Sequence, residues 1–391
     1  MLAKNNGSAK KDTLHVLEVL GNAIVGGMEI YVRNLIRLLP SDLFRITCLC
    51  PYETEYTASL RQLGCHVFVT SMQEDPPWRS IQTAVEIIRN QQIDLVHAHL
   101  PKAHVLGGLA GCLTRTPVVA TIHGMSMTTQ ELGISRTTGT NLLVVCQEAY
   151  IQALTMGVPP DRVTLIPNGV DLDTFVPDRS GHALREAIGV PLNVPLVGFV
   201  GRLAHEKGPD QFIRAAEYVH QQRPDVHFVL VGEGPMRQEL TDMIQAMGLT
   251  DRVHLAGLWA EPWQVYPALD IVAQTSRVEG MPFSLLEGMA CGRPVVAIAV
   301  GGVVELVEVG TTGQLVGPGD WQAVGDWLLE LLADPVRLEA MGRAARERVE
   351  ERFDLRTSIQ MIGDLFYRLA DARLKYPVPW PSTWPVVQNA R

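Results

Sequence analysis

Two glutamates eight residues apart, Glu279 and Glu287, stand in a segment whose other residues predict a loop and then a helix. Gly280 frees the backbone after the first glutamate, and Pro282 suits a first helical position because its missing N–H would be unpaired there. The helix is therefore predicted to begin near Pro282 and to end at Gly292, a residue that readily adopts the left-handed conformation. This places Glu279 in the loop and Glu287 one to two turns inside the helix.

The start of this helix also offers unpaired backbone donors. The N–H groups of Met281, Phe283 and Ser284 form a site that favours an anion. With Glu279 and Glu287 on either side as acceptors for hydroxyl groups, the segment suits a sugar nucleotide: diphosphate at the helix start, one glutamate on the sugar and the other on the ribose. The alternative is an ordinary strand–loop–helix–strand unit with two exposed glutamates.

A second segment, VGFVGRLAHEKGPDQFIRAA, supplies two cations. An apolar strand ends at Val200, and Arg202 and Lys207 precede a helical pattern that starts near Asp210. Arginine offers a planar fork of donors and lysine a mobile point charge, the pairing expected where a diphosphate is held and its leaving charge is neutralised without a metal. The alternative is that Arg202 ends the strand and Lys207 lies in solvent.

Together the two segments resemble the family 4 retaining glycosyltransferases, the group 1 glycosyltransferases of the GT-B fold. GRLxxEKG is followed about seventy residues later by EGxPxSLLEGMAxGxPVV, which carries the family's Glu-x7-Glu motif. The resemblance implies that Arg202 and Lys207 stabilise the leaving diphosphate, that Glu279 orients the sugar and that Glu287 binds the ribose.

Further motifs extend the resemblance over roughly residues 14 to 369. Gly26 and Gly27 follow the first predicted strand and resemble the family's glycine-rich loop, where a side chain would obstruct the donor. His123, in TIHG, stands where the family keeps an active-site histidine beside the donor sugar. Leu258, in VHLAGL, ends a strand that bounds the nucleotide pocket.

The residues that the resemblance assigns to the site fall into two sets. The catalytic set is Arg202, Lys207, Glu279 and His123. The donor-binding set is Gly26, Gly27, Gly280, Met281, Pro282, Phe283, Ser284, Glu287 and Leu258.

The expected fold is α/β with two doubly wound units, because apolar runs alternate with helical patterns and the alternation restarts after the Asn168-Gly169 turn. The resemblance implies that these units are the two Rossmann-like domains of a GT-B fold, facing across a cleft. Residues 1–180 are expected to form an N-terminal acceptor-binding domain, 181–353 a C-terminal nucleotide-sugar-binding domain, and 354–391 a closing helix that returns to the first domain, followed by a Pro-rich tail. The expected strands are 14–20, 45–50, 66–70, 95–99, 117–122, 142–146, one starting at 196, 227–231, 253–256, 271–274 and 295–300.

Composition excludes several other classes of protein. The 391 residues carry a net charge of −9, which argues against nucleic acid as a partner. No apolar run reaches the ~18 residues of a transmembrane helix, and the first residues lack the apolar core of a signal peptide, so a cytoplasmic enzyme is expected. Arg33 and Arg37, one turn apart on a predicted helix, permit peripheral contact with the inner face of a membrane, although a solvated helix face explains them as well.

No metal or cofactor is expected besides the donor substrate. Asp171 and Asp173 match an Asp-x-Asp metal pair, but they follow a turn in the predicted linker. Gly232 and Gly234 lack the third glycine of a dinucleotide motif. His99 ends a predicted strand, where it is expected either to line a cleft or to meet solvent. The six cysteines lack zinc-ligand spacing and are expected to be buried, reduced thiols.

The sequence and the resemblance thus predict a retaining, metal-independent glycosyltransferase. The expected donor is a nucleoside diphosphate sugar, with UDP as the preferred nucleotide, and the expected acceptor is a glycan, glycolipid or other small molecule. The family implies that the leaving phosphate accepts the proton, so no dedicated protein base is expected. The alternatives are a sugar phosphorylase, a sugar-nucleotide epimerase and a catalytically silent nucleotide-sugar-binding protein on the same fold.

Overall fold

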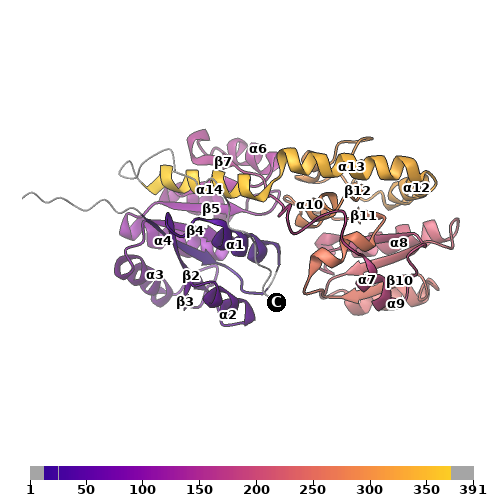
Figure 1. Ribbon diagram of the computed structural model, residues 1–391. Helices are drawn as coiled ribbons and strands as arrows, with labels where there is room; N and C mark the ends of the chain where they lie inside the picture. The colour runs from indigo at the N-terminus through magenta and orange to yellow at the C-terminus, as the bar shows by residue number, and fades with distance from the viewer. Residues whose placement is uncertain (1–12, 25, 371–391) are drawn as a thin grey trace, which may run out of the picture. The chain divides into compact units, whose positions relative to one another are not determined.

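A computed structural model describes residues 13–24 and 26–370. The chain divides into two compact units (Figure 1). The first unit comprises Met1–Val144, Tyr150–Ile166 and Ser358–Arg391, and the second comprises Val145–Ala149 and Pro167–Thr357. Residues 167–180, expected at the end of the first domain, therefore belong to the second unit. The Pro-rich tail and the amino-terminal segment lie outside the described residues.

The first unit is built on a seven-stranded sheet in the order β3-β2-β1-β4-β5-β6-β7, and every neighbouring pair of strands is parallel. Its strands are β1 Leu14–Leu20, β2 Phe44–Cys50, β3 His66–Val69, β4 Leu95–His99, β5 Val118–Ile122, β6 Asn141–Val144 and β7 Val163–Leu165. The helices that belong to it wholly or in part are α1 Gly27–Leu38, α2 Glu55–Gln62, α3 Trp78–Asn90, α4 Pro101–Thr114, α5 Thr129–Thr138, α6 Gln147–Thr155 and α14 Leu355–Ala370.

The second unit is built on a six-stranded parallel sheet in the order β10-β9-β8-β11-β12-β13. Its strands are β8 Leu196–Val200, β9 His227–Val231, β10 Val253–Gly257, β11 Ile271–Gln274, β12 Val295–Ile298 and β13 Gly313–Val316. Its helices are α7 His182–Ala187, α8 Pro209–His220, α9 Arg237–Ala246, α10 Phe283–Ala290, α11 Val303–Leu306, α12 Trp321–Leu332 and α13 Pro335–Arg352.

Apolar strands buried on both faces explain why these sheets are parallel. All seven residues of β1 are buried, as are all five of β9, so each strand needs helices on both sides. Their limits agree with the sequence prediction because a continuous apolar run marks them. The prediction missed β7 and β13, the last strand of each sheet, because such short edge strands carry too few apolar residues to form a run.

The last described helix packs on the first sheet. Phe366 and Tyr367 of α14 are buried, and their rings contact His97 and Phe44 at centroid distances of 5.0 and 5.2 Å. The Tyr367 hydroxyl also donates to the carbonyl of Leu43. The chain therefore passes four times between the two units, and most of its last described helix belongs to the core of the first.

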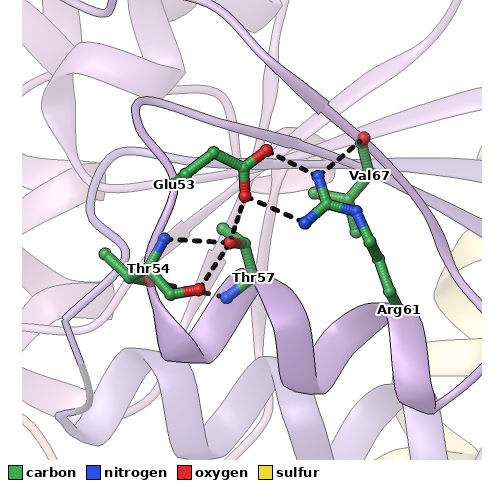
Figure 2. Close-up of polar contacts among 5 residues, drawn as sticks. All are labelled: Glu53, Thr54, Thr57, Arg61 and Val67. Carbon is green, nitrogen blue, oxygen red and sulfur yellow. Dashed lines mark hydrogen bonds and ion pairs between the residues drawn. The ribbon is translucent and has the colours of Figure 1, made fainter.

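A capping box fixes the start of α2 beside the loop that follows β1 (Figure 2). Thr54 Oγ1 accepts from the N–H of Thr57, Thr57 Oγ1 accepts from the N–H of Thr54, and Thr57 Oγ1 also contacts Glu53, which pairs with Arg61. The hydroxyl of Thr54 donates to the carbonyl of Ala23 at 2.7 Å. The cap thus supports the backbone just ahead of the glycine-rich segment.

The cysteine prediction is correct for five of the six residues. All six thiols are free, and Cys112 on α4 is exposed. The expectation that every cysteine is buried is wrong there because the α4 helix, although mostly buried, turns its last residues outward; its neighbour Leu113 is 52% exposed. Among the described helices, none is both long enough and apolar enough to cross a bilayer.

Candidate active site

The cations and the first glutamate come from neighbouring strands of the second sheet. The strand order reverses between β8 and β11, and ligands of doubly wound sheets bind beyond the carboxyl ends of strands at such a switch point. Arg202 and Lys207 follow β8, and Glu279 follows β11. Because β8 and β11 are adjacent parallel strands, residues some seventy positions apart lie at one edge of the sheet.

Lys207 and Glu279 are in direct contact. The Lys207 ammonium donates to both carboxylate oxygens of Glu279, at 2.8 and 2.7 Å. Lys207 keeps 31% of its side-chain surface exposed, whereas Glu279 keeps 4%. The lysine therefore has one face on the carboxylate and another that is open to solvent, where an anion can approach.

The carboxylate of Glu279 is held by further donors. Its Oε1 accepts from Gln274 at 2.6 Å and from the hydroxyl of Ser276 at 2.7 Å. A buried carboxylate with several donors is fixed in place. The interpretation of Glu279 and Glu287 as exposed surface residues does not hold, since both are buried.

The helix start at α10 has the predicted form with a shift of one residue. Pro282 is the N-cap, the helix begins at Phe283, and Gly292 ends it with a φ of +69°. Asn168 donates to the carbonyl of Met281, and the N–H of Gly302 donates to the carbonyl of Gly280. These bonds fix the loop through its carbonyl groups.

The backbone donors of this loop remain available. Within the described part of the chain, the N–H groups of Met281, Phe283 and Ser284 have no acceptor. These N–H groups are therefore free to bind an anion, which is what the predicted anion site requires, and they follow Glu279 closely in sequence.

Glu287 lies inside α10 and faces a buried tyrosine. Tyr266, a fully buried residue ahead of β11, donates its hydroxyl to Glu287 Oε2. Burial raises the pKa of Tyr266 most, and the neighbouring carboxylate of Glu287 raises it further. The tyrosine therefore keeps its proton and remains the hydrogen-bond donor. Glu279 and Glu287 thus have different partners and different surroundings.

Arg202 and Leu258 lie on the surface. The Arg202 side chain is exposed. Its loop is held by backbone hydrogen bonds of the next residue: the carbonyl of Leu203 accepts from the N–H of Met236, and the N–H of Leu203 donates to the carbonyl of Glu233. Leu258 is 77% exposed. Arg202 makes no contact with Lys207 or Glu279 among the described side-chain bonds, so its part in the site rests on its position after β8.

Gly208 lets the chain turn from Lys207 into α8. Its φ is +63°, and a Cβ there would lie 2.0 Å from the carbonyl oxygen of Thr275. The hydroxyl of Thr275 in turn donates to the carbonyl of Gly208 at 2.7 Å. The loop that carries Lys207 therefore packs directly on the backbone that follows β11, and only glycine fits there.

We expect Gly208→Ala to lower the free energy of unfolding by roughly 3 kcal/mol, because the new methyl group must displace the backbone at Thr275. Gly248→Ala is the matched control: Gly248 has a φ of +68° but no atom within 4 Å of a Cβ, so only the conformational cost of about 1 kcal/mol applies. Urea unfolding of the two variants measures the difference. Equal losses would show that the close approach to Thr275 contributes nothing.

In the first unit, His123 directly follows β5 and is partly exposed. Its Nε2 lies 3.0 Å from Nδ1 of His99, whose Nε2 lies 2.7 Å from Glu18 Oε2. His99 is fully buried, so the expectation that it lines a cleft or meets solvent is wrong. The reason is Glu18 on β1, whose side chain enters the same space and supplies an acceptor.

The predicted glycine-rich loop ends at the start of α1. Gly26 is the N-cap of α1 in an extended conformation, with a φ of −156°, and Gly27 is the exposed first residue of the helix. Any residue adopts that conformation at position 26, where a Cβ would lie 3.2 Å from Glu29 Oε2. The backbone conformation therefore does not require glycine at position 26.

Two clusters have the residue types of a metal site. Asp171 accepts from the N–H groups of Asp173 and Thr174, and Asp173 pairs with Arg356, so the Asp-x-Asp pair closes a turn. Atoms of Glu18, His97 and His99 lie within 4.8 Å of one another. Their ring nitrogens already hydrogen-bond to the Glu18 carboxylate at 2.7 to 3.1 Å, contacts that account for the cluster.

The sequence prediction missed the residues that hold the site residues in place. Tyr266 gave no signal, because it is one aromatic residue in an irregular segment. Gln274, the last residue of β11, begins a polar run, QTS, that also contains Ser276, and this change from apolar to polar residues was the available sign. Glu18 stands alone in an apolar strand, which is itself unusual.

Comparison with known proteins shows the family of the chain. The model of the glycosyl transferases group 1 matches residues 182–348, and that of glycosyltransferase family 4 matches residues 25–174. The D-inositol 3-phosphate glycosyltransferase of Xylanimonas cellulosilytica is 31% identical over 380 residues, with 85% of this chain and 90% of the relative covered. The chain belongs to the group 1 glycosyltransferases of family 4.

This group 1 glycosyltransferase also resembles proteins of known specificity. The Escherichia coli UDP-Gal:α-D-GlcNAc-diphosphoundecaprenol α-1,3-galactosyltransferase is 27% identical over 364 residues, with 88% of this chain and 94% of the relative covered. The crystal structure of Anabaena HepE in complex with UDP-glucose superposes with a TM-score of 0.80 at 26% identity, covering 91% of this chain and all of that one. The two Rossmann-like units are those of the GT-B fold.

Proposed function

We propose that this glycosyltransferase transfers a sugar from a UDP-linked donor to a glycan, glycolipid or other small acceptor, with retention at the anomeric carbon and without a metal. One observation carries the proposal. A partly exposed lysine, anchored by a buried carboxylate, and an unpaired helix start arise from the same carboxyl edge of the second sheet. Together they offer a diphosphate a positive charge and backbone donors, which are the groups that replace a divalent cation.

The site residues then divide the work. Lys207 and Arg202 neutralise the charge that develops on the leaving diphosphate, and the N–H groups of Met281, Phe283 and Ser284 bind its oxygens. Glu279 orients the sugar through its hydroxyls, and Glu287 binds the ribose. Gly280 and Pro282 shape the loop, Leu258 borders the nucleotide, and in the first unit the loop at Gly26 and Gly27 leaves room for the donor.

The chemistry needs no protein base in this scheme. The acceptor hydroxyl attacks the anomeric carbon from the face that the diphosphate leaves, and the departing phosphate oxygen takes the hydroxyl proton. The bond between the sugar and the diphosphate breaks as the new glycosidic bond forms. His123 contacts the transferred sugar in this proposal, as the family resemblance implies.

The names of the relatives support the donor and acceptor classes. The E. coli relative is named for a UDP-galactose donor and a diphosphoundecaprenol-linked acceptor, and HepE was crystallised with UDP-glucose. The acceptor class in particular is compatible with peripheral contact with a membrane, for which Arg33 and Arg37 on α1 are the candidates.

We expect UDP, added in the presence of EDTA, to raise the melting temperature of the protein, because Lys207, Arg202 and the helix start do the work of a cation. At about 100 times its dissociation constant a nucleotide adds about 2.7 kcal/mol to stability. Differential scanning fluorimetry with UDP, GDP, ATP and NAD measures this, and the last two serve as controls. A strict requirement for manganese or magnesium would contradict the proposal and direct attention back to Asp171 and Asp173.

A further inference from the structure

Three side chains of the first unit form a continuous hydrogen-bonded series that ends at His123. Glu18 lies on β1, His99 is the last residue of β4, and His123 follows β5. His99 joins the other two, with Nε2 at 2.7 Å from Glu18 Oε2 and Nδ1 at 3.0 Å from Nε2 of His123. Glu18 and His99 are fully buried, whereas His123 is partly exposed.

The charges of the first two groups fix the direction of these bonds. Burial raises the pKa of Glu18, but the charge and N–H of His97 and the N–H of His99 together lower it to about 2, so Glu18 is a carboxylate and only accepts. Burial is the largest of the effects that lower the pKa of His99 to about 4, so at neutral pH its ring carries a single N–H. That hydrogen is on Nε2, where Glu18 accepts it.

The position of the hydrogen on His123 follows from that on His99. With its hydrogen on Nε2, His99 has a bare Nδ1, which can only accept, so Nε2 of His123 donates to it. Burial lowers the pKa of His123 well below its usual value, so this ring also carries one hydrogen at neutral pH. Its Nδ1 is then bare, and within residues 13–24 and 26–370 that atom has no hydrogen-bond partner.

We propose that Glu18 and His99 are positioning residues that hold His123 in the tautomer with a bare Nδ1, which makes His123 an acceptor for a hydroxyl group of the substrate. The inference rests on the proposed function, in which His123 contacts the transferred sugar. A bare Nδ1 accepts the hydrogen of a sugar hydroxyl, whereas the other tautomer would offer a second donor there and lose that bond.

The surrounding side chains hold the series in one arrangement. His97 Nδ1 donates to Glu18 at 3.0 to 3.1 Å, and Nε2 of His97 lies 2.7 Å from Thr121 Oγ1, so the carboxylate is held from a second side. The ring of Tyr31 stands edge-on to His99 and His123, at centroid distances of 5.7 and 5.0 Å. The rings therefore have little freedom to rotate out of line, which is the condition for one tautomer to dominate.

The tautomer is measured directly in the ligand-free protein. We expect long-range ¹H–¹⁵N correlation spectra of histidine-labelled enzyme at pH 7.5 to show His123 as a neutral ring with hydrogen on Nε2 and none on Nδ1. The His123→Gln spectrum assigns its signals. Hydrogen on Nδ1 of His123, an imidazolium, or one equivalent of zinc in the purified protein would overturn the inference, since a zinc ion would occupy the nitrogens that it uses.

Two variants of His99 test whether the tautomer depends on this residue. A glutamine amide can donate to Glu18 and accept from His123, so His99→Gln should keep the wild-type tautomer, whereas His99→Phe should leave His123 exchanging between both. The matched control is His254→Gln, which removes one member of another His–His pair, His227 Nδ1 to His254 Nε2 at 2.9 Å in the second unit. An unchanged His123 spectrum in His99→Phe would refute the positioning role; if that variant does not fold, the wild-type spectrum alone still decides the tautomer.

Kinetics separates this inference from the proposed function. If both hold, His99→Phe lowers kcat by about tenfold with little change in KM for the donor, and His99→Gln restores most of it, because the lost bond acts at the reacting centre. A tautomer that shifts in His99→Phe without any change in kcat would keep the positioning role but refute a contact between His123 and the sugar.

Discussion

Lys207→Ala is expected to lower kcat/KM by roughly 10² to 10³, about 3 to 4 kcal/mol, the loss seen when one preorganised donor to a developing anion is removed. The lysine is ready for that role before any ligand arrives, because both oxygens of Glu279 hold its ammonium while 31% of the side chain stays exposed. Arg202→Ala should fall in the same range, since it removes the other cation that follows β8. Steady-state kinetics with the donor and acceptor, once identified, measures both.

Loss of activity must be separated from loss of fold. Without Lys207 the buried Glu279 keeps Gln274 and Ser276 as donors but has no counter-charge, so the single variant should also melt at a lower temperature. The double variant Lys207→Ala/Glu279→Gln removes the unpaired charge and should regain stability while turnover stays low. Arg214→Ala, an exposed cation on α8, is the matched control for Arg202→Ala and should leave both properties unchanged.

Two outcomes would contradict the assignment of Lys207 and Arg202 to the leaving diphosphate. Either alanine variant that keeps more than about a third of the wild-type kcat/KM would contradict it, because less than 1 kcal/mol of transition-state stabilisation would then be missing. Recovery of turnover together with stability in the double variant would show that Lys207 acts only as the counter-charge of Glu279.

The sequence predicted those parts of the fold and site that depend on local signals. The limits of β1 and β9 follow from continuous apolar runs, and the end of α10 follows from Gly292, whose positive φ suits glycine and little else. The same local signals placed Lys207 between an apolar strand and a helix, and Glu279 in the loop ahead of a helix.

The contacts between strands were beyond local signals. The Lys207–Glu279 pair exists because β8 and β11 are neighbours, and strand order follows from the packing of the whole sheet. The same holds for His99, whose buried partner Glu18 lies 81 positions earlier on a neighbouring strand. A histidine at the end of a strand gives no local sign of which side of the sheet it faces or of which side chain it contacts there.

The two carboxylates of the Glu-x7-Glu motif should respond differently to the loss of charge. Glu287→Gln is expected to weaken the affinity for bare UDP by roughly 10- to 100-fold, about 1.5 to 3 kcal/mol, the range for a hydrogen bond to a charged group. The amide oxygen can still accept from Tyr266, so the helix should stay in place. Tyr266→Phe is the control, because it removes the tyrosine donor and leaves the carboxylate.

Glu279→Gln should instead leave the affinity for bare UDP within about threefold and depress turnover, because its proposed contacts are to the sugar at the reacting centre. The structure explains how the site survives: an amide oxygen in the place of Oε1 still accepts from Gln274, Ser276 and Lys207, and only the contact at Oε2 is lost. Calorimetry with UDP, set beside the rate with the full donor, measures both quantities. Equal losses of UDP affinity in the two glutamine variants would show that the carboxylates act as one structural unit. If Tyr266→Phe loses as much UDP affinity as Glu287→Gln, then Glu287 acts by supporting α10 rather than by binding the ribose.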